Sequence, residues 1–210
     1  MSDASPRPIR VGVQLPQYDA DYGPLRDAVA RAEDVGFDAV FNWDHFFGPR
    51  DSDTKSFEAW TMLGAWAEST SRIEFGTLVS ATAYRNPDLI ADMARTLDHI
   101  SSGRFILGLG AGFKERDFVE YGYDFATPAL RVARFGDALT RVVERMDQLN
   151  PAPTRRVPPL IGGGGEKKTL PLVARYANIW HTFGRRSRIR SQESHSRRTL
   201  RRDWTRPWRD

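Results

Sequence analysis

The sequence predicts an α/β fold in which helices cover a parallel β-sheet. Short apolar runs alternate with longer segments of helical periodicity along residues 11–181. The runs are apolar on both faces, which is typical of parallel strands covered by helices. Repeated strand–helix units indicate either a doubly wound sheet or a (β/α)8 barrel. The 210 residues are enough for one sizeable core or two small ones.

The first third of the chain contains two expected strands. Residues 11–15 form a short β-rich run, and residues 38–43 form a second one. Between them, apolar residues recur at helical spacing until Gly36 ends the helix. That apolar series consists of Leu25, Val29, Ala32 and Val35. A further helix is expected near residues 56–68.

A third strand is expected at residues 73–80, followed by a helix with clear start signals. Asn86 is a good N-cap residue, and Pro87 stands at the first helical position, where proline is favoured. The helical spacing predicts that one apolar face is buried. Its members are Leu89, Met93, Leu97 and Ile100.

The second half of the chain supplies three more expected strands, at residues 104–110, 158–162 and 177–181. Thr127 and Pro128 open the helix after the first of them, and a shorter helix lies between the other two. The buried stripe of the first helix is expected to be Phe135, Leu139, Val142, Met146 and Leu149. The pattern therefore contains about six strand–helix units.

The composition restricts the class of protein. The chain has no cysteine, which excludes a disulfide framework, a thiolate nucleophile and a sulfur-ligated metal site. No apolar run approaches the length of a membrane span, and residues 1–10 lack the apolar core of a signal peptide. We therefore expect a cytoplasmic protein with no membrane partner.

The net charge of +4 is unevenly distributed. Residues 185–210 contain ten arginines and three acidic residues, a balance of +7, which leaves −3 for the residues before them. This basic tail lacks strand and helix patterning, and its charge-rich composition predicts disorder. Arginines together with Trp204 and Trp208 are also ingredients of nucleic-acid binding. We favour disorder or a shifted reading frame over a nucleic-acid partner.

Four consecutive glycines follow the fifth expected strand and lead to two lysines. Because Pro171 is tolerated only in the first turn of a helix, the next helix is expected to begin near residues 167–169. Its free N–H groups and positive dipole end would open onto the glycines, which predicts a phosphate site. The spacing matches neither a Walker loop nor the dinucleotide fingerprint, and a merely close-packed turn is the alternative. The predicted phosphate-binding residues are Gly162, Gly163, Gly164, Gly165, Lys167 and Lys168.

If the strands form a barrel, the residues that follow each strand share one rim with the glycine loop. A histidine beside an aspartate, hydroxyl groups and glycines on that rim suit a flat aromatic cofactor with a phosphorylated tail. The sequence contains no His-x-x-x-His pair and no clustered set of carboxylates and histidines, so no metal site is predicted. The rim candidates are Asp44, His45, Ser80, Ala81, Thr82 and Gly110.

The chain resembles the bacterial luciferase-like flavin superfamily, and within it the F420-dependent oxidoreductases. The resemblance runs from about Val11 to Gly184. It is carried by "VGVQLP", "GFDAVFNWDHFF", "GTLVSATAYRNPDLIADMARTLDHISSGRFILGLGAGF" and "PPLIGGGGEKKTLPLVARYANIWHTFG". It implies a TIM-type (β/α)8 barrel that binds coenzyme F420, or alternatively FMN, on its C-terminal rim.

The resemblance also implies roles for the candidate residues. The deazaflavin ring would lie near Asp44, His45 and the strand end at Ser80, where the family often has a non-proline cis peptide. The cofactor phosphate would lie at the glycines and lysines. The implied reaction is hydride transfer between the cofactor and an organic substrate, with His45 or Asp44 as the catalytic proton donor or electrostatic partner.

Three departures from the family pattern matter. Phe113 stands where sugar-phosphate-oxidising relatives carry a glutamate, so a sugar-phosphate substrate is not implied. Residues 150–157 are shorter than in relatives, and part of a substrate-side lid is expected to be missing. Relatives continue for two more strand–helix units. We therefore expect an incomplete barrel over residues 1–184, C-terminally truncated or frame-shifted, and a basic tail over residues 185–210.

Three functions remain open at this point. The leading hypothesis is an F420-dependent oxidoreductase acting on an unknown small molecule. An FMN-dependent luciferase-like monooxygenase is the alternative on the same fold. A hypothesis of another class is a non-catalytic barrel fragment with a basic interaction tail. The oligomeric state, including a homo-oligomer, is not determined by the sequence.

Overall fold

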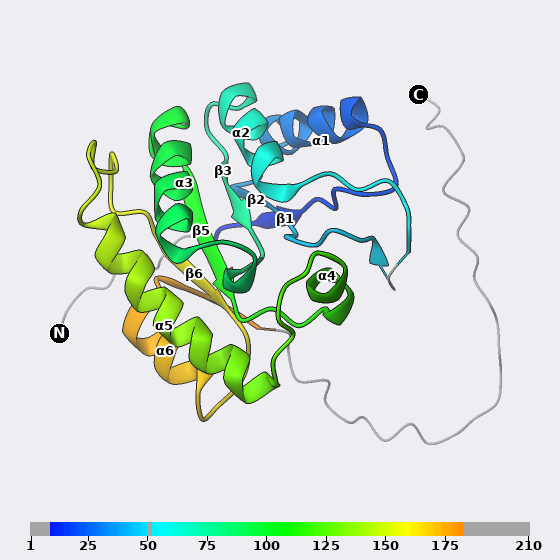
Figure 1. Cartoon of the computed structure of the whole chain (residues 1–210). Helices are drawn as coiled ribbons and strands as arrows, with labels where there is room; N and C mark the ends of the chain where they lie inside the picture. The colour runs from blue at the N-terminus through cyan, green and yellow to red at the C-terminus, as the bar shows by residue number, and fades with distance from the viewer. Residues whose placement is uncertain (1–8, 50–51, 183–210) are drawn as a thin grey trace, which may run out of the picture.

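The computed structural model describes residues 9–49 and 52–182, and the expected basic tail lies outside the described residues. Strands and helices alternate along the described chain, as the sequence predicts (Figure 1). The strands are β1 (Gly12–Gln14), β2 (Ala39–Asn42), β3 (Glu74–Thr77), β4 (Ser80–Ala81), β5 (Phe105–Gly110), β6 (Pro159–Gly162) and β7 (Ile179–His181). The helices are α1 (Tyr22–Asp34), α2 (Ala59–Ser69), the 3-10 turn η2 (Thr82–Tyr84), α3 (Pro87–Ile100), α4 (Glu115–Glu120), α5 (Pro128–Met146) and α6 (Thr169–Tyr176).

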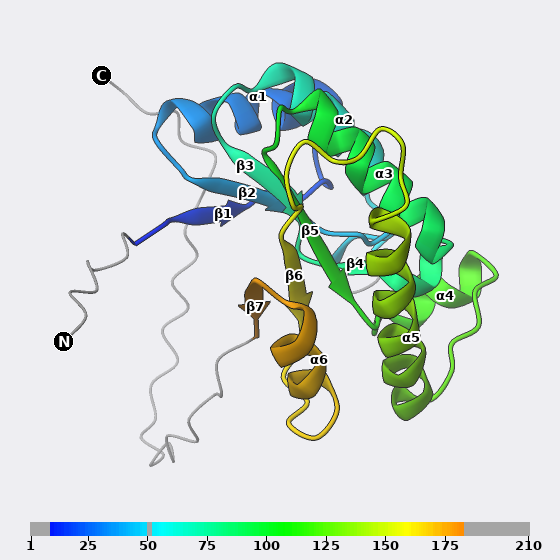
Figure 2. The same cartoon turned by 90° about the vertical axis from the view of Figure 1, so that its left-hand side faces the viewer.

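The strands form one curved parallel sheet. Their order is β1-β2-β3-β5-β6-β7, and the short β4 pairs with β5. In Figure 2, helices α1, α2, α3, α5 and α6 follow one another along one side of this sheet. Sequential order around a curling parallel sheet is the arrangement of a TIM barrel rather than of a doubly wound sheet. The fold is an incomplete (β/α)8 barrel, which confirms the predicted fold class.

The predicted helix starts are confirmed by their capping hydrogen bonds. The Asn86 side chain accepts from the N–H of Asp88 at 2.9 Å, and the Thr127 hydroxyl accepts from the N–H of Leu130 at 3.4 Å. Helix α6 begins at Thr169, so Pro171 lies in its first turn.

Two elements differ from the predicted pattern. Helix α2 begins at Ala59 because the Glu58 carboxylate accepts from the N–H groups of Trp60 and Thr61 and so caps the helix. The third expected strand is divided into β3 and β4, and the peptide bond between Leu78 and Val79 in the break is cis.

Helix α4 was not predicted. It is a single short helix that follows β5 and ends before Gly122, which has a φ of 72°. Such a left-handed residue is a common helix terminator. Because the helix is so short, it carries no periodic apolar pattern for the sequence to reveal.

The predicted buried face of α3 is partly wrong. Leu89 is 50% exposed and Ile100 is 40% exposed, whereas Leu97 is buried as expected. Helix α3 packs against both the sheet and α5, which turns a neighbouring face inward. That face consists of Ile90, Ala91, Ala94 and Leu97. Val35 is likewise exposed, because α1 ends one residue before it.

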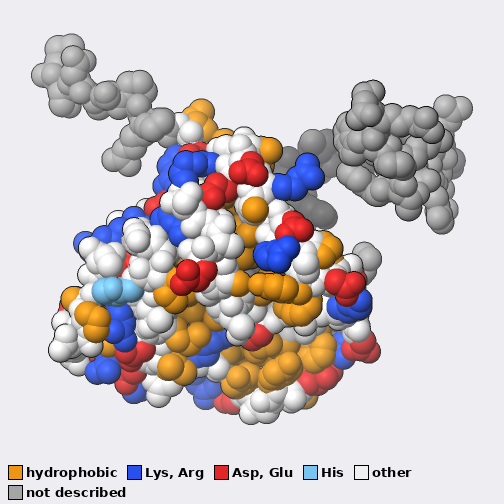
Figure 3. Space-filling model, turned by 90° about the horizontal axis from the view of Figure 1, so that it is seen from above, with side chains coloured by type: hydrophobic (Ala, Val, Ile, Leu, Met, Phe, Trp, Pro, Cys, Tyr) orange, Lys and Arg blue, Asp and Glu red, His pale blue; other side chains and the backbone are white. Residues whose placement is uncertain are grey.

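The hydrophobic core lies between the sheet and the helices. Phe75 of β3 and Phe105 of β5 have ring centroids 5.7 Å apart, and Trp66 and Phe135 bring the helices onto the same core. On the face shown in Figure 3, apolar side chains gather in the lower half with charged side chains around them. No helix within the described residues is long and apolar enough to cross a membrane.

Strands β3 and β5 approach one another very closely. A Cβ atom on Gly76 would collide with the carbonyl oxygen of Ile106, and one on Gly108 would collide with that of Thr77. We call this contact the β3–β5 seam. Glycine is required at both positions because the backbones themselves are in contact.

The shortened segment at residues 150–157 lies at the opposite end of the barrel from the carboxyl ends of the strands. The buried Asp98 accepts from the N–H and hydroxyl of Thr154 at 2.6 and 2.7 Å, and Arg155 donates to the carbonyl of Phe105 at the start of β5. An α-to-β connection belongs to this amino-terminal end. The expectation that the segment contributes to a substrate-side lid is therefore wrong.

Candidate functional site

The sequence-predicted site residues lie along one edge of the sheet. Asp44 and His45 follow β2, Ser80 begins β4, Gly110 ends β5 and Gly162 ends β6. Because all these strands are parallel, their carboxyl ends face the same way. This carboxyl edge is where catalytic residues of TIM barrels come together.

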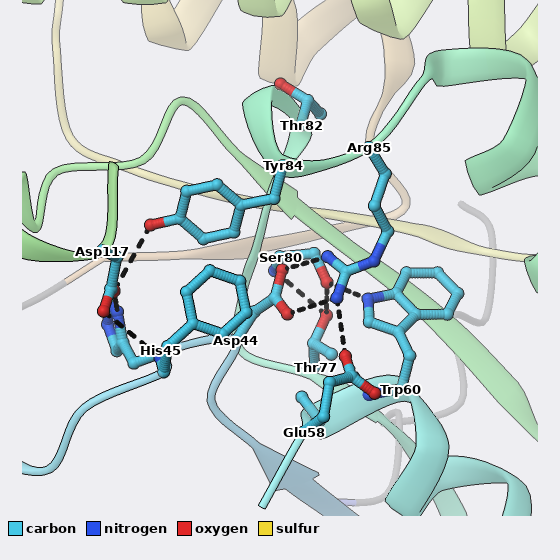
Figure 4. A network of polar contacts seen from close by, with 12 residues as sticks. Asp44, His45, Glu58, Trp60, Thr77, Ser80, Thr82, Tyr84, Arg85 and Asp117 are labelled. Atoms are coloured by element: carbon cyan, nitrogen blue, oxygen red, sulfur yellow. Dashed lines mark hydrogen bonds and ion pairs between the residues drawn. The ribbon is translucent and has the colours of Figure 1, made fainter. Parts of the chain in front are cut away.

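His45 is held by a buried carboxylate from α4. Its Nδ1 lies 2.6 Å from Oδ2 of Asp117, whose other oxygen accepts from the N–H of Phe46 at 3.2 Å. Asp117 is fully buried, and the hydroxyl of Tyr84 also donates to it at 3.3 Å (Figure 4). A carboxylate on Nδ1 fixes the orientation of an imidazole and leaves Nε2 as the nitrogen for proton exchange.

Asp44 lies in a second polar cluster, with Arg85 and Glu58. Two guanidinium nitrogens of Arg85 contact the two carboxylate oxygens of Asp44 at 2.7 and 2.9 Å, and Arg85 also reaches Glu58 at 2.7 Å (Figure 4). Burial raises the pKa of Asp44 to about 6, and the charge of Arg85 opposes that rise. Only 3% of Asp44 is exposed, so this carboxylate is enclosed by protein.

The same cluster fixes the start of β4. Trp60 donates from its ring nitrogen to the Ser80 hydroxyl at 2.8 Å, and Ser80 contacts the Thr77 hydroxyl at 2.8 Å. The guanidinium of Arg85 lies 5.4 Å from the centre of the Trp60 ring. Ser80 and Thr82 are both buried, and their side chains are already hydrogen-bonded within the protein. These two side chains therefore hold the backbone of the carboxyl edge in place from the protein interior.

Val79 lies between the ends of β5 and β6. A Cβ atom on Gly110 would come within 2.7 Å of its side chain, and one on Gly162 within 2.8 Å. The cis bond before Val79 agrees with the peptide geometry that the resemblance implies at this strand end. The glycines at both strand ends thus leave room for an apolar surface in the middle of the edge.

The glycine loop follows β6 and opens toward solvent. The N–H of Gly163 is bonded to the carbonyl of His181, and Gly163 has a φ of 134°. A Cβ atom on Gly164 would lie 2.8 Å from the Thr182 hydroxyl, and one on Gly165 would lie 2.9 Å from that of Thr169. Only glycine fits these close approaches without displacing a neighbour.

The positive end of α6 adjoins the glycine loop. Lys168 is the N-cap residue of α6, and no side chain caps the helix there. Lys167 and Lys168 are exposed. The predicted free N–H groups at this helix start are not found: those of Thr169 and Leu170 donate to the carbonyl of Gly165, and Pro171 has none. The exposed glycines and the two ammonium groups are what this loop offers to a phosphate.

Three residues with close contacts to the candidates were not assigned a catalytic or cofactor-binding role from the sequence: Asp117, Tyr84 and Arg85. Asp117 and His45 are 72 positions apart in the sequence, and the pairing depends on where the unpredicted α4 packs. An acidic residue a few positions beyond a strand end was the one available signal. Within the described residues, no group of three histidine, cysteine, aspartate or glutamate side chains is arranged to hold a metal ion.

A family model described as luciferase-like monooxygenase matches residues 7–203. A Mycobacterium tuberculosis protein that bears the name of a coenzyme F420-dependent oxidoreductase is 35% identical over 153 residues. An F420-dependent glucose-6-phosphate dehydrogenase of Amycolatopsis mediterranei is 32% identical over 175 residues. The alignments cover 73% and 74% of this chain but 40% and 51% of the two relatives. The chain thus spans about half of their length.

The fold is also similar to solved structures. An F420-dependent secondary alcohol dehydrogenase, solved in complex with an F420–acetone adduct, superposes with a TM-score of 0.75 and 22% sequence identity. The match covers 82% of this chain and 57% of that one. At this level of identity, the similarity concerns the fold alone.

Proposed function

Because the chain belongs to the luciferase-like monooxygenase family, we propose that it acts as an F420-dependent oxidoreductase. The reaction is hydride transfer between the deazaflavin and a small organic substrate. The chain spans about half of its curated relatives, so its activity is a proposal for the protein to which these residues belong. An FMN-dependent monooxygenase is the alternative that the family description keeps open.

The observation that carries this proposal is the shared carboxyl edge. A histidine oriented by Asp117, an apolar surface at Val79 and a glycine loop followed by two exposed lysines all lie at the same end of one sheet. A cofactor with an aromatic ring and a phosphorylated tail requires all three features together.

The residues present fit such a cofactor. Gly162, Gly163, Gly164 and Gly165 would hold the phosphate with Lys167 and Lys168. Side chains on Gly164 and Gly165 would collide with Thr182 and Thr169, so both positions of this exposed loop require glycine. The ring would be held at the strand ends formed by Ala81, Thr82 and Gly110, in front of Val79.

When bound, F420 supplies the carbon that accepts or donates the hydride. The side chain of His45 holds the proton that leaves or joins the substrate oxygen, through Nε2. Asp117 keeps the ring in that orientation through its contact with Nδ1. Asp44 is a positioning residue in this scheme, since its two oxygens are bound to Arg85 inside the protein.

Cofactor titration tests the proposal. Purified protein is mixed with F420 or with FMN, and quenching of cofactor fluorescence is followed. We expect saturable quenching of F420. Binding of FMN without F420 would favour the monooxygenase, and binding of neither would favour the non-catalytic fragment.

The phosphate loop has its own test. Replacing Lys167 and Lys168 by alanine should raise the Kd for F420 about five- to thirtyfold, because exposed charge contacts contribute up to about 1 kcal/mol each. The effect should shrink at high salt. The matched control removes two exposed arginines of α1, Arg26 and Arg31, and should leave the Kd unchanged. Equal effects in both double variants would contradict the assignment.

A further inference from the structure

A group of aromatic side chains lies next to His45, and two of them are exposed. Phe113 is 71% exposed and Tyr121 is 54% exposed, although both are large apolar rings. We define the aromatic wall as Phe46, Phe47, Phe113 and Tyr121. Exposed aromatic rings beside a polar site are uncommon on a protein surface, and they commonly mark a place where a ligand binds.

The wall is ordered by ring contacts. Phe46 and Tyr121 are stacked, with centroids 3.8 Å apart, and Phe47 meets Tyr121 edge-on at 6.1 Å. The guanidinium of Arg116 lies over Phe47 at 3.8 Å. These contacts hold the rings of Phe46, Phe47 and Tyr121 in place before any ligand arrives, which lowers the entropic cost of binding.

Phe113 is the member of the wall that contacts His45. Its ring lies 5.3 Å from the imidazole, at an interplanar angle of 85°. A substrate whose oxygen reaches His45 would therefore place its neighbouring carbon substituent against Phe113. The first atoms beyond the reacting centre are those that distinguish one substrate from another.

Among the residues that the structure describes, the cationic groups in contact with the wall are Lys114 and Arg116, and both are paired with protein partners. Lys114 donates to the carbonyls of Phe47 and Gly48 at 2.7 and 2.8 Å, and Arg116 is paired with Asp53 and Glu120. A phosphate ester bound here would have to compete with these contacts and would face an aromatic ring. Both conditions disfavour an anionic substrate.

We propose that Phe113 is a specificity-determining residue and that the substrate is an uncharged alcohol or carbonyl compound with an apolar, preferably aromatic, substituent. This inference rests on the proposed function, because it assigns the substrate side of the same site. It does not require that F420 be the cofactor. The wall and His45 alone define the apolar subsite.

The first experiment measures binding without cofactor. The probe is 4′-fluoroacetophenone, observed through the broadening of its fluorine NMR signal. We expect broadening by the wild-type protein, about tenfold weaker binding by Phe113→Ala, and near wild-type binding by Phe113→Leu. Val119→Ala is the matched control, since Val119 is an exposed apolar residue of α4, and it should bind like the wild type.

The second experiment uses the F420-loaded protein and compares 1-phenylethanol with glucose 6-phosphate. We expect kcat/KM to favour the aryl alcohol, and Phe113→Glu to lower it about tenfold through KM while Val119→Glu does not. The Kd for F420 should be the same in all variants.

Failure to bind F420 would remove the proposed function but leave the NMR result valid. Equal probe binding by Phe113→Ala and wild type, no probe binding by the wild type, or a preference for the sugar phosphate would overturn this inference.

Discussion

At the scale of single residues, the chain separates two neighbouring groups into different roles. Asp44 and His45 are adjacent in sequence, yet Asp44 is enclosed with Arg85 while His45 faces Asp117 and Phe113. The sequence identified both positions because they follow a strand. It did not distinguish them, since the distinction depends on partners from distant segments.

Asp117 provides the first test at this scale. Asp117→Asn removes the negative charge beside His45 Nδ1 and retains the shape of the side chain. We expect kcat/KM to fall at least about tenfold, because the imidazole loses the carboxylate that fixes its tautomer and orientation. The Kd for F420 should not change.

Nitrogen NMR of the His45 ring in the same variant should show an altered population of protonated Nδ1, a change that a purely structural defect would not produce selectively. Asp124→Asn is the control, because Asp124 is an exposed aspartate paired with Arg134. If Asp117→Asn retains both full activity and the wild-type ring signal, Asp117 has no orienting role.

Asp44 gives a prediction about pH. Burial raises its pKa to about 6, above the value of roughly 3.9 in an unfolded chain. Between these values the native state binds more protons than the unfolded state, so the contribution of Asp44 to stability falls as pH rises. Asparagine does not titrate. The free energy of unfolding of the wild type, taken relative to that of Asp44→Asn, should therefore fall by about 1–3 kcal/mol from pH 4 to pH 7.

Urea unfolding at several pH values measures this difference. If the wild type instead gains stability relative to Asp44→Asn as pH rises, pairing with Arg85 outweighs the cost of burying the charge. A constant difference would mean that the pKa of Asp44 is the same in the folded and unfolded chains.

At the scale of elements, signals local to the sequence succeeded and those that depend on packing did not. The caps at Asn86 and Thr127 and the start of α6 were predicted, because each depends on residues within one helical turn. The buried face of α3 was partly wrong, because α5 and the sheet together set its rotation. The division of the third expected strand into β3 and β4 was not predicted, because its apolar run is continuous in the sequence.

The strand ends at β5 and β6 can be tested by adding one methyl group. Gly162→Ala would place a Cβ atom 2.8 Å from the Val79 side chain, and overpacking of this kind costs about 1–3 kcal/mol. Adding Val79→Ala should restore most of the lost stability. Gly23→Ala is the control, since nothing lies within 4 Å of its added Cβ atom. Thermal and urea unfolding measure all four proteins, and the absence of rescue would mean that Val79 is not the obstacle.

At the scale of the whole molecule, the parallel sheet determines which parts are most protected. The general architecture was predicted from alternating patterns alone, and the choice of a barrel came from the family resemblance. How the strand ends are brought together, including the α4 contact with His45, required the three-dimensional structure.

Hydrogen exchange should reproduce the order of the strands. All residues of β5 are buried and β5 lies inside the sheet, whereas β1 and β7 end the described strand order and are partly exposed. We expect peptides from residues 105–110 to exchange slowest and those from β1 and β7 to exchange at least about tenfold faster. Mass spectrometry after exchange in heavy water measures this ranking. Equal protection of β5 and β7 would contradict it.

The β3–β5 seam has a practical consequence for engineering. Backbone atoms touch where Gly76 and Gly108 face their neighbours, so neither position tolerates even the smallest side chain. A library designed to alter substrate preference should therefore keep both glycines of the β3–β5 seam and vary the aromatic positions after β2 and β5. Substitutions in the seam would yield mainly misfolded proteins, whereas substitutions after the strands would change which substrates bind.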